Sequence, residues 1–258
     1  MSDLLSEQSG KILSITFNRV EKNNAFDDQI LADLCNILEK AEADSTVQVI
    51  ILKANGKHFS AGADLNWMKR MAEYTEAENL ADAKVLADVM HRLHKSPKPT
   101  IAVVQGAAYG GGAGLAAACD IAIAADTARF CFSEVKLGLI PAVISPYVVN
   151  AIGSRAATWL FTSAEVFDAK RAYELQLVQH CVPEHDLLDF AKTFASNMAT
   201  LAPEAVKASK YLVQAVSHKP IDEKLIHETA SLIAKKRVSK EGQVGLQAFL
   251  NKQTPVWD

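Results

Sequence analysis

The chain lacks a surplus of charge of either sign. Its 27 Lys and Arg residues and 30 Asp and Glu residues give a formal net charge of −3 at pH 7. A protein with this balance has no general attraction for nucleic acid or for an anionic membrane surface. We therefore expect neither a nucleic-acid partner nor a membrane partner.

Cysteine is scarce. Four cysteines, Cys35, Cys119, Cys131 and Cys181, are spread over 258 residues. Their spacing matches no zinc or redox motif, and so few cysteines do not form a disulfide framework. The histidines show no H-E-x-x-H pattern. We predict buried, reduced thiols in a cytoplasmic protein without a metal site.

Uninterrupted hydrophobic stretches of membrane-spanning length are also missing. Residues 101–119 carry one strongly polar side chain, Gln105, and are long enough to cross a bilayer. Glycine interrupts this stretch repeatedly between residues 106 and 114, and each glycine costs up to about 1 kcal/mol in a helix. The pattern therefore predicts a buried strand, a glycine turn and a short helix. The amino terminus has no positive or apolar region typical of a signal peptide.

Apolar periodicity predicts alternating strands and helices along the chain. We expect strands at 12–17, 47–52, 100–105, 121–124 and 178–182. We expect helices after Asp27 and at 65–93, 110–119, 168–175, 185–200, 203–216 and 222–237. This alternation indicates an α/β fold. Because strand signals fade towards the end of the chain, we predict a core over residues 1–195 and a helical carboxy-terminal region over residues 196–258.

The first segment whose residues suit ligand binding or catalysis is Lys57–Leu65, with the sequence KHFSAGADL. Small residues before a helix let a ligand approach the backbone, and the free N–H groups at a helix start suit an anion. Ser60 and Gly62 form half of a G-x-S-x-G nucleophile elbow, but His58 stands at the first glycine position. A serine nucleophile is therefore not expected. Taken alone, the segment is equally consistent with a turn without function.

The second segment is Gly106–Gly114, with the sequence GAAYGGGAG. It matches neither G-x-G-x-x-G in frame nor a phosphate-binding loop. Two glycine-lined helix starts in one chain indicate two backbone N–H donors that converge on one oxygen. Such an oxyanion hole stabilises a reaction by about 2.7–4 kcal/mol for each donor.

The third segment is Phe130–Pro141, with the sequence FCFSEVKLGLIP. Glu134 lies in an otherwise apolar stretch, where burial of a carboxyl raises its pKa and suits it to proton transfer. The alternative is a solvent-facing Glu134 paired with Lys136.

In this order and spacing, the three segments resemble the crotonase (enoyl-CoA hydratase/isomerase) superfamily over essentially the whole chain. The end of the chain, from Ser239 to Lys252, also resembles the tail of that family. Residues 58–71 and 133–149 are most similar to its bacterial methylglutaconyl-CoA hydratase branch, which acts in leucine degradation.

The resemblance implies a spiral of strand-strand-helix turns, a helical carboxy-terminal trimerisation region and an acyl-CoA thioester substrate. It places Ala63 and Gly111 in the oxyanion hole and Glu134 as the catalytic acid–base. CoA is part of the substrate, so no separate cofactor is expected. Substrate contacts are expected at Lys22, Asn23, Ala61, Asp64, Leu65, Tyr109, Gly110, Pro141 and Lys252, the last acting from a neighbouring subunit of a homotrimer or dimer of trimers.

Gly114 departs from the pattern of this family. Hydratases in it usually carry a second glutamate three residues after the oxyanion glycine, and here that position is Gly114. Either one glutamate suffices for hydration of a 2-enoyl-CoA, or another acid or a carboxylate of the substrate holds the water. A 3,2-enoyl-CoA isomerase that uses one glutamate is the alternative activity. A catalytically silent acyl-CoA-binding protein is the alternative from another class.

Overall fold

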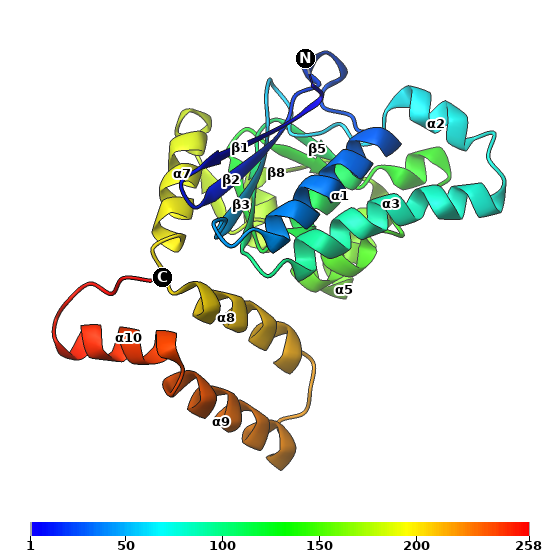
Figure 1. Cartoon of the computed structure of the whole chain (residues 1–258). Coiled ribbons are helices and arrows are strands. Elements are labelled where there is room, and N and C mark those ends of the chain that lie inside the picture. Colours follow the sequence, from blue (N-terminus) through cyan, green and yellow to red (C-terminus); the bar gives the residue numbers. More distant parts are fainter. Residues whose placement is uncertain (1, 258) are drawn as a thin grey trace.

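The computed structural model describes residues 2–257, and its main sheet contains six strands in the order β1-β2-β3-β4-β6-β9 (Figure 1). These strands are β1 (Leu4–Ser9), β2 (Ile12–Phe17), β3 (Val49–Ala54), β4 (Thr100–Val104), β6 (Ile121–Ala125) and β9 (His180–Val182). Neighbouring strands run parallel except for the β1–β2 hairpin. Strands β3 and β4 are apolar and buried on both faces, as a covered parallel sheet requires.

A second, three-stranded sheet is formed by β5 (Ala107–Tyr109), β7 (Arg129–Cys131) and β8 (Phe167–Asp168). It arises because the chain repeats one unit, a strand of the large sheet followed by a short strand and a helix. The units β4–β5–α4 and β6–β7–α5 stack in parallel, with α4 at Gly111–Ala118 and α5 at Ser145–Ser163. The predicted α/β class and the spiral of strand-strand-helix turns are confirmed.

The two preceding turns of the spiral follow the same path with single bridging residues in place of the short strand. Strand β2 leads through Phe26 to α1 (Asp28–Ala43), and β3 leads through Ser60 to α2 (Leu65–Met71) and α3 (Glu76–Lys95). Parallel bridges join Phe26 to Ala63 and Ser60 to Ala108. The successive turns are thereby aligned, and each helix follows a loop at the same end of the spiral.

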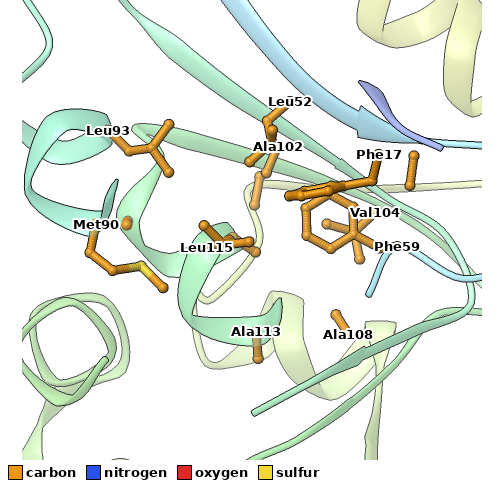
Figure 2. Close-up of a cluster of buried hydrophobic side chains, with 14 of the residues drawn as sticks. Phe17, Leu52, Phe59, Met90, Leu93, Ala102, Val104, Ala108, Ala113 and Leu115 are labelled. Carbon is orange, nitrogen blue, oxygen red and sulfur yellow. The ribbon is translucent and has the colours of Figure 1, made fainter. Parts of the chain in front are cut away.

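The core lies between the large sheet and helices α1, α3, α4 and α5. Figure 2 shows Leu52 and Ala102 of the sheet facing Met90 and Leu93 of α3 and Leu115 of α4. The opposite face of the sheet is covered by α7 (Leu187–Met198). The glycine-rich stretch predicted not to span a membrane forms β4, β5 and α4. Within residues 2–257, no helix is long and apolar enough to cross a membrane.

The carboxy-terminal arm consists of α8 (Pro203–Val216), α9 (Glu223–Arg237) and α10 (Lys240–Leu250), set apart from the rest in Figure 1. Lys210 of α8 ties the arm to the core through an ion pair of 2.8 Å with Asp120. Large apolar side chains of the arm, such as Ile226 and Phe249, are exposed. The predicted boundary at residue 195 falls inside α7, and the division into two units and the trimer stay predictions.

Several elements differ from the sequence prediction. The helix expected at 65–93 is two helices, because Thr75 forms a capping box with Glu78 that starts α3. Strands β1, β5, β7 and β8 and helices α5 and α10 were not predicted. Other short elements are α6 (Ala169–Glu174) and the 3-10 helices η1 (Val20–Lys22), η2 (Glu134–Leu137) and η3 (Glu184–Asp186). All four cysteines are free thiols, but Cys181 is exposed, so the prediction of buried thiols was wrong there.

Candidate active site

Two glycine-containing loops lie side by side at the starts of α2 and α4. The Ser60 N–H donates to the carbonyl oxygen of Ala107 at 3.0 Å, and the Ser60 carbonyl oxygen accepts from Tyr109 N–H at 3.0 Å. Both strands run in the same direction from this bridge, so Ala63 and Gly111 come three residues later on each. A Cβ atom at Gly112 would lie 2.8 Å from the Ser60 carbonyl oxygen. Only glycine permits this close approach.

The N–H groups of Ala63 and Gly111 are available to a ligand. The Gly62 carbonyl oxygen accepts from Phe26 N–H at 2.9 Å. Because a trans peptide places its C=O and N–H on opposite sides, the Ala63 N–H points away from Phe26. Gly111 is the first residue of α4, where N–H groups have no partner within the helix. In residues 2–257, neither N–H donates a hydrogen bond.

The Glu134 carboxyl lies beside this pair of donors. Its Oε1 would be 3.2 Å from a Cβ atom at Gly110, the residue directly before Gly111. Gly110 has a φ of 51°, a conformation that favours glycine. The carboxyl is therefore held against the start of α4, next to the second N–H donor.

The environment of Glu134 is that of a proton-transfer group. Its Oε2 is the one buried side-chain oxygen or nitrogen without a hydrogen-bond partner among the residues the structure describes. Burial raises the pKa of Glu134 above its ordinary value. No ion pair joins it to Lys136 within residues 2–257, so the alternative of a solvent-facing pair is wrong. An unpartnered buried carboxyl oxygen is costly and calls for a functional explanation.

Asn24 and Ser60 support the first donor loop. Asn24 is 1% exposed, and its Nδ2 donates to the carbonyl oxygens of Asn55 at 2.8 Å and His58 at 2.7 Å. The Ser60 hydroxyl donates to the Asn24 carbonyl oxygen and accepts from Gly62 N–H. Ser60 is fully buried and its hydroxyl is used in this way, which agrees with a structural role; that it is not a nucleophile stays a prediction.

Asp64 holds the start of α2. Its Oδ1 accepts from the N–H groups of Asn66 and Trp67, and its Oδ2 lies 2.9 Å from Lys22 Nζ and 3.3 Å from Arg19. Burial acts to raise the pKa of Asp64, but the hydrogen bonds from Lys22 and the two N–H groups outweigh it and lower that pKa. Asp64 therefore positions α2 and Lys22, and a direct contact with substrate stays a prediction.

The other predicted substrate contacts fall into two groups. The Ala61 N–H donates to the Asn23 carbonyl oxygen at 3.0 Å, which brings these residues, Lys22 and the exposed Leu65 to one rim of the site. Tyr109 and Gly110 belong to the second donor loop, and the buried Pro141 follows η2. Lys252 follows α10, which lies at the opposite end of the molecule from α2 (Figure 1). Its contact from a neighbouring subunit stays a prediction.

Three residues of the site were missed: Asn24, Phe26 and Ile144. The Phe26 ring lies against Gly111, where a Cβ atom would come within 2.6 Å of its Cζ. Asn23 and Asn24 both have positive φ angles, and an Asn-Asn pair in a turn is a signal that could have found Asn24. Ile144 lies against Gly114, and no local pattern shows that contact.

The site offers acid–base chemistry with one carboxyl. Two N–H donors can stabilise negative charge on a carbonyl oxygen, and the neighbouring carboxyl can move a proton. No group of three or more His, Cys, Asp or Glu side chains within residues 2–257 could hold a metal ion. This arrangement is suited to chemistry in which negative charge develops on a carbonyl oxygen.

The chain belongs to the enoyl-CoA hydratase/isomerase family. The model of this family matches residues 7–258. The 2,3-dehydroadipyl-CoA hydratase of Escherichia coli (strain K12) is 33% identical over 256 residues, which are 99% of this chain and 98% of the relative. The 1,2-epoxyphenylacetyl-CoA isomerase of the same organism is 31% identical over 259 residues, 99% of this chain and 98% of the relative.

Solved structures agree with this assignment. A Legionella pneumophila protein described as an enoyl CoA hydratase/isomerase (crotonase) has a TM-score of 0.97 and 65% sequence identity, with 100% of both chains covered. An enoyl-CoA hydratase from Shewanella pealeana has a TM-score of 0.95 and 45% identity over 99% of this chain and 96% of that one. The relatives thus include both hydratases and an isomerase by name.

Proposed function

We propose that the protein is an enoyl-CoA hydratase that adds water across the double bond of a 2-enoyl-CoA thioester. The observation that carries this proposal is the unpartnered Oε2 of Glu134, buried beside the free N–H groups of Ala63 and Gly111. The family membership supports the thioester as the substrate class. CoA enters as part of the substrate.

In the proposed reaction, the N–H groups of Ala63 and Gly111 donate to the thioester oxygen. Glu134 takes a proton from a water molecule while the water oxygen bonds to C3 and the double-bond electrons move to form the enolate. Glu134 then returns the proton to C2, and the enolate collapses to the thioester. One carboxyl is thus sufficient in principle, because it ends each cycle in the state in which it began.

We further propose a branched or carboxylated acyl chain, with methylglutaconyl-CoA as the leading candidate. The support is the similarity of residues 58–71 and 133–149 to the methylglutaconyl-CoA hydratase branch. The site offers one carboxyl, that of Glu134, to hold the attacking water. A carboxylate on such a substrate would supply a second. We propose leucine degradation as the pathway and the cytoplasm as the compartment.

A second candidate is a 3,2-enoyl-CoA isomerase. The observation that favours it is the lone carboxyl, since converting a 3-enoyl ester to a 2-enoyl ester needs one group that removes a proton from C2 and returns it to C4. The enolate and its two N–H donors are the same in both reactions. The two activities differ in how the anion forms: in hydration water adds to C3, whereas in isomerisation the carboxyl removes the C2 proton and no water adds.

The test is an assay of the purified protein with crotonyl-CoA, methylglutaconyl-CoA and a 3-enoyl-CoA. Loss of the conjugated enoyl-thioester absorbance reports hydration, and its appearance from the 3-enoyl ester reports isomerisation. We expect the fastest turnover with methylglutaconyl-CoA. Isomerisation alone would favour the second candidate. No turnover of any ester, with CoA esters still bound, would contradict both and leave an acyl-CoA-binding protein.

A further inference from the structure

Gly114 lies on the face of α4 that continues from Gly110, the residue next to the Glu134 carboxyl. The Gly114 N–H donates to the Gly110 carbonyl oxygen at 3.1 Å, so the two residues are one helical turn apart on one face. Gly110 is also the residue against which Glu134 Oε1 lies. Since Cα–Cβ bonds tilt towards the amino end of a helix, a side chain at 114 would point back towards Glu134.

The space for such a side chain is filled by another residue. A Cβ atom at Gly114 would lie 2.2 Å from Ile144 Cγ2, 2.7 Å from Ile144 Cβ and 3.2 Å from Met90 Cε. Ile144 is 2% exposed and directly precedes α5, and Met90 is fully buried. Figure 2 shows Met90 of α3 beside the helix that carries Ala113 and Leu115. The two distances to Ile144 are too short for a Cβ atom without a shift of structure, whereas the distance to Met90 is tight.

We infer that Ile144 determines the one-carboxyl character of the site, because it occupies the position from which a side chain at 114 would face Glu134. Gly114 and Ile144 are then a complementary pair: a large residue at 144 requires glycine at 114. This inference rests on the proposed function for its chemical consequence, but its packing claim stands on the contact alone. Ile144 touches no reacting atom in this account and acts as a specificity-determining residue through the space it takes.

The packing claim is tested by a double-mutant cycle, called the stability cycle below, in which the melting temperatures of Gly114→Ala, Ile144→Gly and the double variant are compared with wild type. Alanine is the better helix former, so Gly114→Ala would stabilise α4 if space were open. We expect it to lower the melting temperature in the wild-type background and to raise it, or leave it unchanged, in the Ile144→Gly background. A gain of stability from Gly114→Ala in the wild-type background would overturn the inference.

The chemical claim is tested by placing an acid at 114 where space has been made. The variant Gly114→Glu/Ile144→Gly is compared with Gly114→Gln/Ile144→Gly, which has the same shape without the charge. We expect the glutamate variant to hydrate crotonyl-CoA at least about tenfold faster, with an added ionisation in its pH–rate profile, since general acid–base catalysis contributes ~10²–10⁴-fold. Gly114→Glu alone should show no such gain.

Equal rates for the two double variants would overturn the chemical claim and reduce Ile144 to a core residue. Folding of each double variant is checked by circular dichroism. If neither double variant folds although Ile144→Gly does, the space left by Ile144 does not admit a side chain that reaches Glu134, and the chemical claim is overturned. A wild-type protein without enoyl-CoA turnover would refute the proposed function, while the stability cycle would still decide the packing claim.

Discussion

Replacement of Glu134 by glutamine separates the catalytic cost of this residue from its structural cost. The variant keeps the shape of the side chain and removes the only buried carboxyl oxygen that lacks a partner within residues 2–257. Since Gly114 leaves no second acid on the same face of α4, no neighbouring group replaces the lost proton transfer. We expect kcat to fall by ~10²–10⁴-fold. That loss corresponds to about 3–5 kcal/mol of transition-state stabilisation.

The same substitution should stabilise the folded protein at neutral pH. Burial raises the pKa of Glu134, whose ordinary value is 4.5, so the folded state disfavours its ionised form. The contribution of the protonated Glu134 carboxyl to the free energy of unfolding is therefore fully present below that ordinary value. It is lost as the pH rises through the raised pKa. Glutamine leaves an uncharged polar atom in the same place, so the expected gain comes from the loss of the buried charge alone. Glu134→Gln should raise the melting temperature at pH 7 and show little gain near pH 4.

The assay is steady-state turnover of methylglutaconyl-CoA together with calorimetric melting at both pH values. KM should change little where substrate release is fast, because the oxyanion donors and the rim residues are untouched. Glu165→Gln, a change of an exposed glutamate on the loop after α5, is the matched control and should retain wild-type kcat. Turnover above a third of wild type in Glu134→Gln would refute the catalytic assignment.

Asp64→Ala should destabilise the protein by about 2 kcal/mol or more at pH 7, since it removes a helix cap and a charged hydrogen bond. Because the pKa of Asp64 is lowered, its contribution to the free energy of unfolding is present above the ordinary value of 3.8 and is lost as the pH falls through the pKa of the folded state. In urea unfolding, the difference between wild type and Asp64→Ala should therefore be smaller at low pH than at pH 7. Asn24→Asp should cost about 2–4 kcal/mol, because the buried carbonyl oxygens of Asn55 and His58 lose their donor; a cost below about 0.5 kcal/mol in urea unfolding would contradict that role. Light scattering at micromolar concentration should give the mass of a homotrimer or a dimer of trimers, because the carboxy-terminal arm exposes apolar side chains such as Ile226 and Phe249, and a monomeric mass would refute this.

The central strands β4 and β6 were predictable because their side chains are apolar on both faces, and β2 was predictable from its β-branched residues. Residues 12–17 were predicted to the residue, and 100–105 and 121–124 within one residue. Helix ends were less certain where local capping competes with apolar periodicity. The periodic pattern of residues 65–93 continues across residues 72–75, and only the Thr75 capping box shows where α3 begins. Strand β1 was missed because its exposed residues alternate weakly on an edge.

The candidate site was predictable where its chemistry lies in short segments. Ala63, Gly111 and Glu134 each stand in a motif, and the spiral brings those motifs together through the Ser60–Ala108 bridge. The meaning of Gly114 was not predictable in the same way. Its small size could equally have left room for a branched substrate, and only the contact with Ile144 shows that the space is filled by the protein.

Two clefts lie away from the candidate active site and are alternative places for a ligand. One lies between the sheet and the carboxy-terminal arm and is lined by residues that include Lys11, Lys207 and Trp257. The other is lined by residues that include Asp120, Tyr147 and Lys210. Neither includes the oxyanion donors or Glu134. The position of a bound substrate therefore discriminates between these places.

The most direct test is a crystal structure with an unreactive acyl-CoA analogue bound. We expect the thioester oxygen about 2.7–3.1 Å from the nitrogen atoms of both Ala63 and Gly111, the distance that an oxyanion hole requires. The Glu134 carboxyl should face the carbons next to the thioester. A thioester seated in either of the other clefts, or with its oxygen away from both N–H groups, would contradict the account.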